Sequence, residues 1–317
     1  MKYGIREICD VVLKAKANNT EVGNAIFQEG QPVLYFDTLK TSSMEGAATT
    51  VYAQGGRGNS RLIAWEGERT VTFTMEDALI SDLGLAVLTG AGLVDPTTDA
   101  PLKIHTTSKF GVKLNTEKTG FTDTSFTVDE VVSKDQMMWV MFMDKNDDIL
   151  HTAKIDNLDQ STVLEVTNTS DKRKSVIKYA PSSSGTNGIK AEVLKNTAKL
   201  MFDFYVEKSS GARQIEITPD KFGGNYYLEA STLFRDQNGK DMPAEFIIPN
   251  CKVQSNFNFS LASTGDPSTF TFTMDAFPDY TVYDPTKKVL SVIQVIEDEA
   301  APLADHGDYT PPKTTTT

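Results

Sequence analysis

The sequence predicts a mainly β protein, because most of its apolar segments alternate with polar residues at a period of two, while helical spacing is rare. Residues 69–77 are the clearest case. Val71, Phe73 and Met75 point to one face of a strand, and the threonines interleaved with them point to the other. Clusters of turn-forming residues separate such segments, which favours several antiparallel strands.

A second segment, near the other end of the chain, has almost the same pattern. Residues 268–277 repeat the string Phe-Thr-Met followed by an acidic residue and alanine. The likeness is either a structural pseudo-repeat or a coincidence between two short threonine-rich strands. Residues 252–261 also alternate, and the turn at 264–267 predicts that they form a long antiparallel hairpin with the second segment.

The first alternating segment has its own neighbours in the sequence. Residues 41–54 predict a strand broken at Gly46, followed by a long loop at 55–61 and a turn at 66–68. Downstream, the apolar residues at 79, 80, 83, 87 and 88 form one stripe of a helix, which Gly90 and Gly92 can end in the left-handed conformation. We expect this helix to pack on the sheet.

Two turn-rich breaks, at 95–101 and 181–188, predict the domain organisation. Strands are expected between the breaks at 137–143 and 162–167, and strands that return to the first domain are expected at 200–206, 214–218 and 226–234. The predicted parts are a first domain in two pieces, residues 1–99 and 196–297, an inserted β domain at 100–195, and a disordered tail at 298–317, rich in proline, acidic residues and threonine.

Composition excludes several classes of protein. The 317 residues, 39% of them hydrophobic, can bury a sizeable core, and the formal net charge of −12 argues against a surface that neutralises nucleic-acid phosphates. Cys9 and Cys251 form neither a disulfide framework nor a metal motif, so we expect reduced thiols in the core. The charged start and the lack of a long apolar run predict synthesis in a reducing cytoplasm without membrane insertion.

No pattern of residues predicts catalysis, so we expect no enzymatic activity, no cofactor and no bound metal. The histidines lie far apart, at His105, His151 and His306. The acidic stretch 144–148 is similar to the start of a calcium-binding EF-hand loop, but Ile149 stands where glycine is required and Ile155 where glutamate is required. This departure favours a polar hairpin turn.

The stretch Val51-Tyr52-Ala53-Gln54-Gly55-Gly56-Arg57-Gly58-Asn59, running into the alternating strand at 70–79, resembles tail tube proteins of long-tailed bacteriophages. The closing strand Pro249-Asn250-Cys251 and the turn Gly265-Asp266-Pro267-Ser268 also look like that family. The resemblance covers residues 30–95 and 215–295 and consists of a pattern, not an invariant motif.

The resemblance implies a tail-tube-type β-sandwich with a flanking helix, in which long hairpins contribute to a β-barrel shared between subunits. It implies hexameric rings that stack into the hollow tail of the virion, through which the tape-measure protein and the DNA pass without specific binding. Tail terminator, baseplate and sheath proteins are the other partners it implies. Residues 100–195 depart from the family pattern and are expected to decorate the outside, which favours a tail without a tightly fitted sheath.

On this interpretation the threonine-bearing faces of the two alternating strands line the lumen, because threonine favours strands while exposing a hydroxyl group. The candidate lumen-facing residues are Thr70, Thr72, Thr74, Glu76, Thr269, Thr271, Thr273 and Asp275. Acidic groups there would repel DNA phosphates, although Glu76 and Asp275 can equally be solvent-exposed strand ends. The candidates for an inter-ring or inter-subunit loop are Gly55, Gly56, Arg57, Gly58 and Asn59.

Two other structural or binding functions remain open. A β-sandwich binding module or adhesin would expose aromatic residues on a sheet face; Tyr226, Tyr227 and Trp139 are available, but core packing is their expected role. A capsid decoration or baseplate protein would form trimers or small closed rings instead of open-ended tubes.

Overall fold

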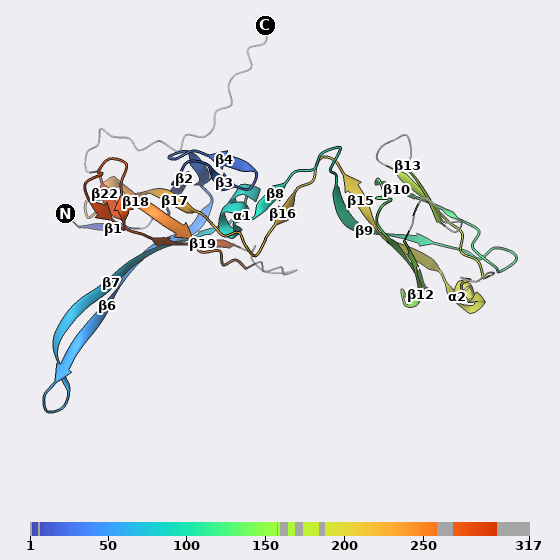
Figure 1. Ribbon diagram of the computed structural model, residues 1–317, viewed down its shortest axis with the longest axis horizontal. Helices are drawn as coiled ribbons and strands as arrows, with labels where there is room; N and C mark the ends of the chain where they lie inside the picture. The colour runs from blue at the N-terminus through green and yellow to red at the C-terminus, as the bar shows by residue number, and fades with distance from the viewer. Residues whose placement is uncertain are drawn as a thin grey trace, which may run out of the picture. The chain divides into compact units, whose positions relative to one another are not determined.

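A computed structural model describes residues 2–5, 7–156, 158, 164–168, 174–183, 188–258 and 269–296, and it is mainly β (Figure 1). The chain divides into two compact units. Unit 1 comprises Met1–Val94 and Ile215–Thr317, and unit 2 comprises Asp95–Gln214. The tail expected at 298–317 lies outside the described residues.

Unit 1 is built on one large antiparallel sheet with the strand order β5-β2-β17-β18-β19-β7-β6. Its strands are β2 (Asp10–Ala15), β5 (Pro32–Phe36), β6 (Leu39–Gly55), β7 (Ser60–Asp77), β17 (Asn225–Asp236), β18 (Asp241–Val253) and β19 (Phe270–Ala276). Two short strands extend it, because β1 (Tyr3–Ile5) pairs with β17 and β22 (Val292–Val295) pairs with β18. Three small ladders complete the unit: β3 (Thr20–Val22) with β4 (Ala25–Phe27), β8 (Gly92–Val94) with β16 (Gln214–Glu216), and β20 (Asp279–Tyr280) with β21 (Lys288–Val289).

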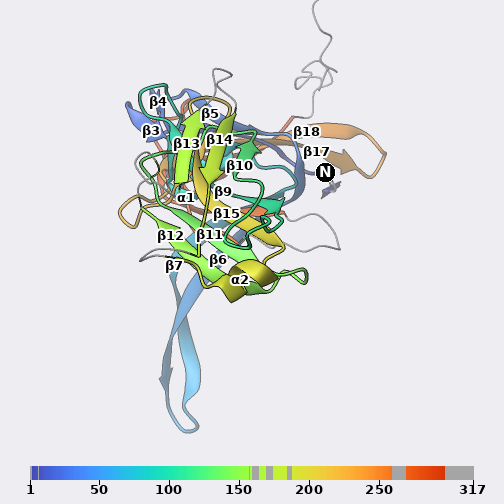
Figure 2. The same ribbon diagram turned by 90° about the vertical axis from the view of Figure 1, so that its right-hand side faces the viewer.

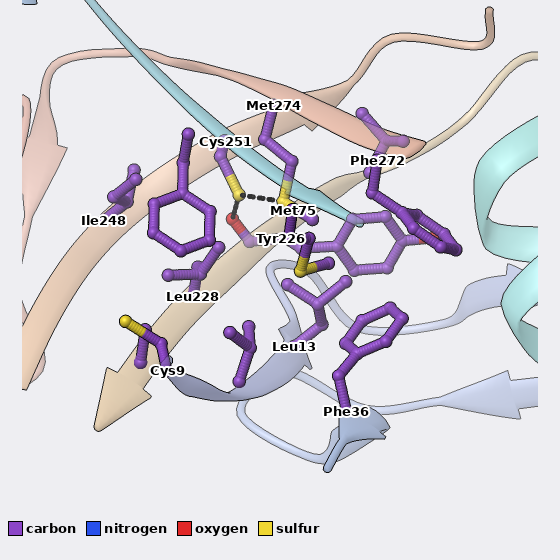
Figure 3. Close-up of a cluster of buried hydrophobic side chains, with 14 of the residues drawn as sticks. Cys9, Leu13, Phe36, Met75, Tyr226, Leu228, Ile248, Cys251, Phe272 and Met274 are labelled. Carbon is purple, nitrogen blue, oxygen red and sulfur yellow. Dashed lines mark hydrogen bonds between the residues drawn. The ribbon is translucent and has the colours of Figure 1, made fainter. Parts of the chain in front are cut away.

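The two strands with the repeated pattern, β7 and β19, are direct neighbours in this sheet. Phe73 lies opposite Met274, and Met75 lies opposite Phe272. All four side chains are buried, and they pack with residues such as Leu13 in the core of unit 1 (Figure 3). Adjacent strands that share one buried face and one wet face need the same alternation, so the likeness has a physical reason whether or not the segments share an origin.

The hairpin of β6 and β7 is longer and more regular than predicted. Gly46 does not break β6, since it pairs with Val71 in the continuous ladder. The turn expected at 66–68 is also wrong, because β7 passes through it and the ladder only shifts register between Ala48 and Thr50. A β-carbon on Gly67 would lie 2.5 Å from Thr49 Oγ1, which accepts a hydrogen bond from the Glu68 amide at 2.9 Å. The glycine therefore lets the Thr49 side chain lie close to the β7 backbone at a bulge.

The prediction that residues 252–261 form a long hairpin strand is wrong for most of the described residues in this range. The ladder between β18 and β19 covers only Cys251–Val253, and residues 254–258 form no strand. Phe257 is exposed, so the alternating apolar residues of this segment do not face the core as a strand would require. Residues 259–268, including the predicted turn, lie outside the described part of the chain.

The predicted helix exists as α1 (Asp82–Thr89), but it begins after Leu79 and Ile80, which the predicted apolar stripe included. Ser81 caps its start, where Ser81 Oγ accepts a hydrogen bond from the Gly84 amide at 2.9 Å. Gly90 ends it in the left-handed conformation, with φ of 71°, and its amide donates to the Ala86 carbonyl. Alanine 86 and the two residues after it are buried, so the helix packs on the sheet as expected.

Unit 2 is a β-sandwich with its own core. One sheet has the order β12-β11-β15-β9, formed by β9 (Leu102–Gly111), β11 (Met138–Met143), β12 (Ile149–Ile155) and β15 (Lys199–Lys208). The other has the order β10-β14-β13, formed by β10 (Ser125–Val128), β13 (Leu164–Asn168) and β14 (Ser175–Tyr179), and a short helix α2 (Ala191–Asn196) follows (Figure 2). Phe202 packs against both Phe126 and Tyr179 in the core of this unit.

Several predicted strands are confirmed, although one belongs elsewhere. The strand predicted at 137–143 is β11, and those predicted at 214–218 and 226–234 overlap β16 and β17. The strand at 200–206 was expected to return to the first domain, but β15 pairs with β9 and β11 and lies in unit 2. The strand expected at 162–167 overlaps β13, with residues 162 and 163 outside the described part.

Candidate assembly surface

The candidate lumen residues of β7 and β19 lie together on the sheet face opposite the core of unit 1. Thr74 pairs with Thr273, Glu76 with Thr271, and Thr72 with Asp275. Asp275 joins the strands, because it accepts hydrogen bonds from Thr72 Oγ1 at 3.3 Å and from Gln254 Nε2 at 2.9 Å. Thr269 immediately precedes β19, whereas Thr70 lies beyond the end of the β7–β19 ladder.

Strand β6 extends this surface with residues that the sequence interpretation missed. Cross-strand pairing across β6, β7 and β19 creates three rows, Thr41–Glu76–Thr271, Ser43–Thr74–Thr273 and Glu45–Thr72–Asp275. We call these nine residues the threonine face. Its polar atoms are hydroxyl and carboxylate groups, so the surface is wet and acidic. The alternation of Thr41, Ser43 and Glu45 in the sequence was the signal that could have identified them.

Beyond the threonine face, β6 and β7 continue without a third strand and project from the sheet (Figures 1 and 2). We call residues 47–70 the arm. Its side chains are exposed except for the half-buried Ala53 and Gly55. An isolated two-stranded ribbon is only marginally stable in water, so the arm gains little from its own contacts.

The arm carries apolar side chains that are unusual for a solvent-exposed ribbon. Val51 lies opposite Trp65, and Ala53 lies opposite Ile63, so these pairs share one face. The exposed fractions are 62% for Val51, 54% for Ile63 and 53% for Trp65. On the other face Tyr52 lies opposite Ala64, and the Arg61 guanidinium is 4.1 Å from the centre of the Tyr52 ring. Grouped exposed apolar side chains are typical of surfaces that contact another molecule.

The tip of the arm contains the predicted inter-subunit loop. Gly55 is the last residue of β6, and residues 56–59 form the turn to β7. Gly56, Gly58 and Asn59 have positive φ angles of 79°, 93° and 51°, which the two glycines adopt without strain. Arg57 is exposed at the tip. The structure thus brings these candidates together at the end of a projecting hairpin, well separated in the ladder from the threonine face.

The sheet of unit 1 also leaves an edge for pairing. Strand β6 is the last in the sheet order, and β7 is its only partner among the described strands. An unpaired edge presents backbone amide and carbonyl groups that can extend the sheet with a strand from another chain. The edge of β6 and the arm therefore belong to one hairpin, and the threonine face extends from that hairpin onto β19.

The described residues contain no cluster of three or more histidine, cysteine or acidic residues that could hold a metal ion. Residues 144–148 form the predicted turn between β11 and β12, in which Asp144 Oδ1 accepts hydrogen bonds from the amides of Asn146 and Asp148. Cys9 and Cys251 are free buried thiols, as predicted. Burial raises the pKa of the Cys9 thiol and raises that of Cys251 to about 12, so neither is a ready nucleophile. Cys251 Sγ lies 3.4 Å from the Tyr226 carbonyl oxygen and 3.8 Å from Met274 Sδ (Figure 3).

Comparison with known families agrees with this geometry. Residues 19–109 and 177–289, which together exceed half of the chain, match a phage-derived family of tube-like proteins, so the chain is a structural protein of the phage tail tube class. It belongs to the YomU/Tube protein family. The matched regions contain β6, β7 and β17 to β19. No curated protein sequence is significantly similar to the chain. None of the helices in the described residues has the length and hydropathy that a membrane span requires.

Proposed function

We propose that this chain is the subunit of a hollow phage tail tube, built from stacked hexameric rings and serving as the conduit for genome delivery. The observation that carries the proposal is the hairpin of β6 and β7, which combines an open sheet edge with an arm of exposed apolar side chains. Family membership supports the same conclusion. The subunit acts by assembly, without catalysis, cofactor or metal.

Ring closure follows from the edge of β6. If each subunit pairs this edge with a strand of its neighbour, the six sheets join into one barrel and no edge remains exposed. A closed barrel requires each strand to have one inner and one outer face. In unit 1 the opposite face is already filled by the core residues, such as Phe73 and Phe272, so the threonine face turns to the lumen.

The chemistry of the threonine face suits a passage for DNA. Glu45, Glu76 and Asp275 place negative charge on it, and like charges repel the phosphates of a passing duplex. Its hydroxyl groups keep the surface wetted without offering the clustered lysine or arginine residues that grip nucleic acid. DNA and the tape-measure protein thus pass along the lumen without specific binding.

Ring stacking is the role proposed for the arm. The pairs Val51–Trp65 and Ala53–Ile63 bury their apolar surface only if the arm lies against another subunit. Unit 2, which the chain inserts between β8 and β16, lies outside the tube on this account. Tail terminator, baseplate and sheath proteins are the partners expected at the ends and on the outside of such a tube.

Negative-stain electron microscopy of the purified full-length protein tests the proposal. Hollow tubes or six-fold rings are the expected particles. A persistent monomer, or a trimer as expected of a capsid decoration protein, would contradict it.

A further inference from the structure

The outer face of the four-stranded sheet in unit 2 exposes an aromatic side chain where core packing was expected. In β11 the residues Met138, Val140 and Phe142 point into the core, so Trp139 points outward. Trp139 is 39% exposed, whereas Tyr226 and Tyr227, expected like it to pack in a core, are buried. The correction for Trp139 follows from the alternation of β11 itself.

Cross-strand pairing surrounds Trp139 with groups that form hydrogen bonds. Trp139 lies between Lys154 on β12 and Asp203 on β15, and Thr107 on β9 follows Asp203 in the same row. The next aromatic residue on the face is Tyr205, which is half-buried. It lies opposite His105, and their rings meet edge to face with centres 5.7 Å apart.

The lysines on this face are already paired with carboxylates, and His105 contacts another. His105 Nε2 lies 2.7 Å from Asp203 Oδ1, and Lys154 Nζ lies 2.7 Å from Asp156 Oδ1. Lys109 pairs with Asp147 at 3.1 Å, and Lys103 pairs with Asp135. A face whose lysines are paired with carboxylates does not select a polyanion.

We propose that this face, centred on Trp139 and Tyr205, binds an uncharged polysaccharide. The C–H groups of a pyranose ring pack against the flat apolar surface of an aromatic side chain, and its hydroxyl groups hydrogen-bond to neighbouring polar groups. The Trp139 ring, with Asp203 on one side and Lys154 on the other, supplies both kinds of contact. The inference concerns unit 2 alone and does not depend on tube assembly.

The composition of the face favours a glycan over a protein partner. The centres of protein–protein interfaces are depleted in charged residues, since burying them under a protein removes water from each ion pair. Here ionised groups directly flank the aromatic ring. A hydroxyl-rich ligand can satisfy those groups, whereas an apolar protein surface cannot.

The chain contains only two tryptophans, Trp65 and Trp139, which allows a direct optical test. In full-length Trp65→Phe, the fluorescence comes from Trp139 alone; in full-length Trp139→Phe, it comes from Trp65 on the arm. Each variant is titrated with cellohexaose, chitohexaose and laminarihexaose, and dextran sulfate serves as the charged comparison. A saturable change with at least one neutral hexasaccharide is expected in Trp65→Phe and not in Trp139→Phe.

Affinity measured by calorimetry completes the test. Trp139→Ala should weaken binding at least tenfold, and Lys178→Ala, which changes an exposed side chain on the other sheet of unit 2, should leave the affinity unchanged. Thermal unfolding in the dissociated state checks that both variants are folded, as expected because neither side chain belongs to the core cluster of unit 2. The proposal is overturned if no neutral hexasaccharide binds, if Trp139→Ala binds as wild type does, or if dextran sulfate binds more tightly. A loss of oligomers in Trp139→Ala would also overturn it, since the face would then be a protein interface.

Discussion

Replacing Trp65 by alanine separates assembly from folding. Trp65 is 53% exposed on the arm and lies outside the core cluster of unit 1, so in the isolated subunit its loss affects contacts within the arm alone, and the free energy of unfolding should change by no more than about 1 kcal/mol. In the assembled tube the same side chain would be covered. With about 250 Å² for a tryptophan side chain, the exposed fraction leaves roughly 130 Å² to bury, worth at most about 3 kcal/mol at about 25 cal/mol per Å².

That energy corresponds to a roughly hundredfold weaker subunit contact. Sedimentation velocity over a concentration series measures the assembly threshold, and thermal unfolding below that threshold measures the stability of the subunit. Phe272→Ala is the matched contrast, because Phe272 is fully buried and its truncation should cost about 3–5 kcal/mol of stability. The reasoning fails if Trp65→Ala lowers the melting temperature as much as Phe272→Ala does, or if it assembles at the wild-type concentration.

Three further predictions concern the lumen, the helix end and a half-buried carboxyl group. Thr74→Cys should react with a small maleimide in both the tube and the dissociated subunit, but with a large polyethylene-glycol maleimide only in the dissociated subunit. The two native thiols are buried and should give a low background. Equal labelling of both states by the large reagent would contradict a lumenal position. Gly90→Ala should lower the free energy of unfolding by more than about 1 kcal/mol in chemical denaturation, because φ at Gly90 is positive and a β-carbon would lie 2.4 Å from the Phe222 carbonyl carbon. Gly92→Ala is the control and should have a far smaller effect, because no atom lies close to a β-carbon there. Burial, and to a smaller extent the nearby Glu229, raises the pKa of Glu245, so the folded state binds the Glu245 proton more tightly than the unfolded state and stability falls as the pH rises above the ordinary pKa of 4.5. Glu245→Gln should therefore be more stable than wild type at pH 7, and the difference should disappear near pH 4. A variant that is less stable than wild type at pH 7 would refute this.

Alternation and capping residues predicted much of unit 1. The pattern in β7 and β19 identifies two half-buried strands, and Gly90 marks the end of α1 through backbone chemistry that is local to the sequence. The start of α1 was placed too early, although Ser81 is a typical N-cap residue. The threonine-bearing faces were recognisable for the same reason, because a period of two divides a strand into a core face and a wet face.

Long-range pairing could not be predicted from such local signals. Gly46 and Gly67 were interpreted as breaks in the strands. Gly46 instead pairs with Val71 within the ladder, and Gly67 lies at a bulge where the Thr49 side chain comes close to the backbone. Strand β15 was assigned to the wrong unit, because its regular alternation fits either core and only pairing with β9 decides. Trp139 was expected to pack in the core, but it alternates with the buried residues Met138 and Val140 of β11 and therefore points outward.

The arm is the feature whose removal tests the account most directly. Gly46 and Val71 are cross-strand partners, so an Asn-Gly turn can replace residues 47–70 and close a short hairpin on the intact sheet. Electron microscopy of both proteins, with thermal unfolding as the check on folding, is the measurement. The account predicts hollow tubes from the wild-type chain and folded, dispersed subunits or unstacked rings from the shortened one. Tubes of normal length from the shortened chain would contradict it.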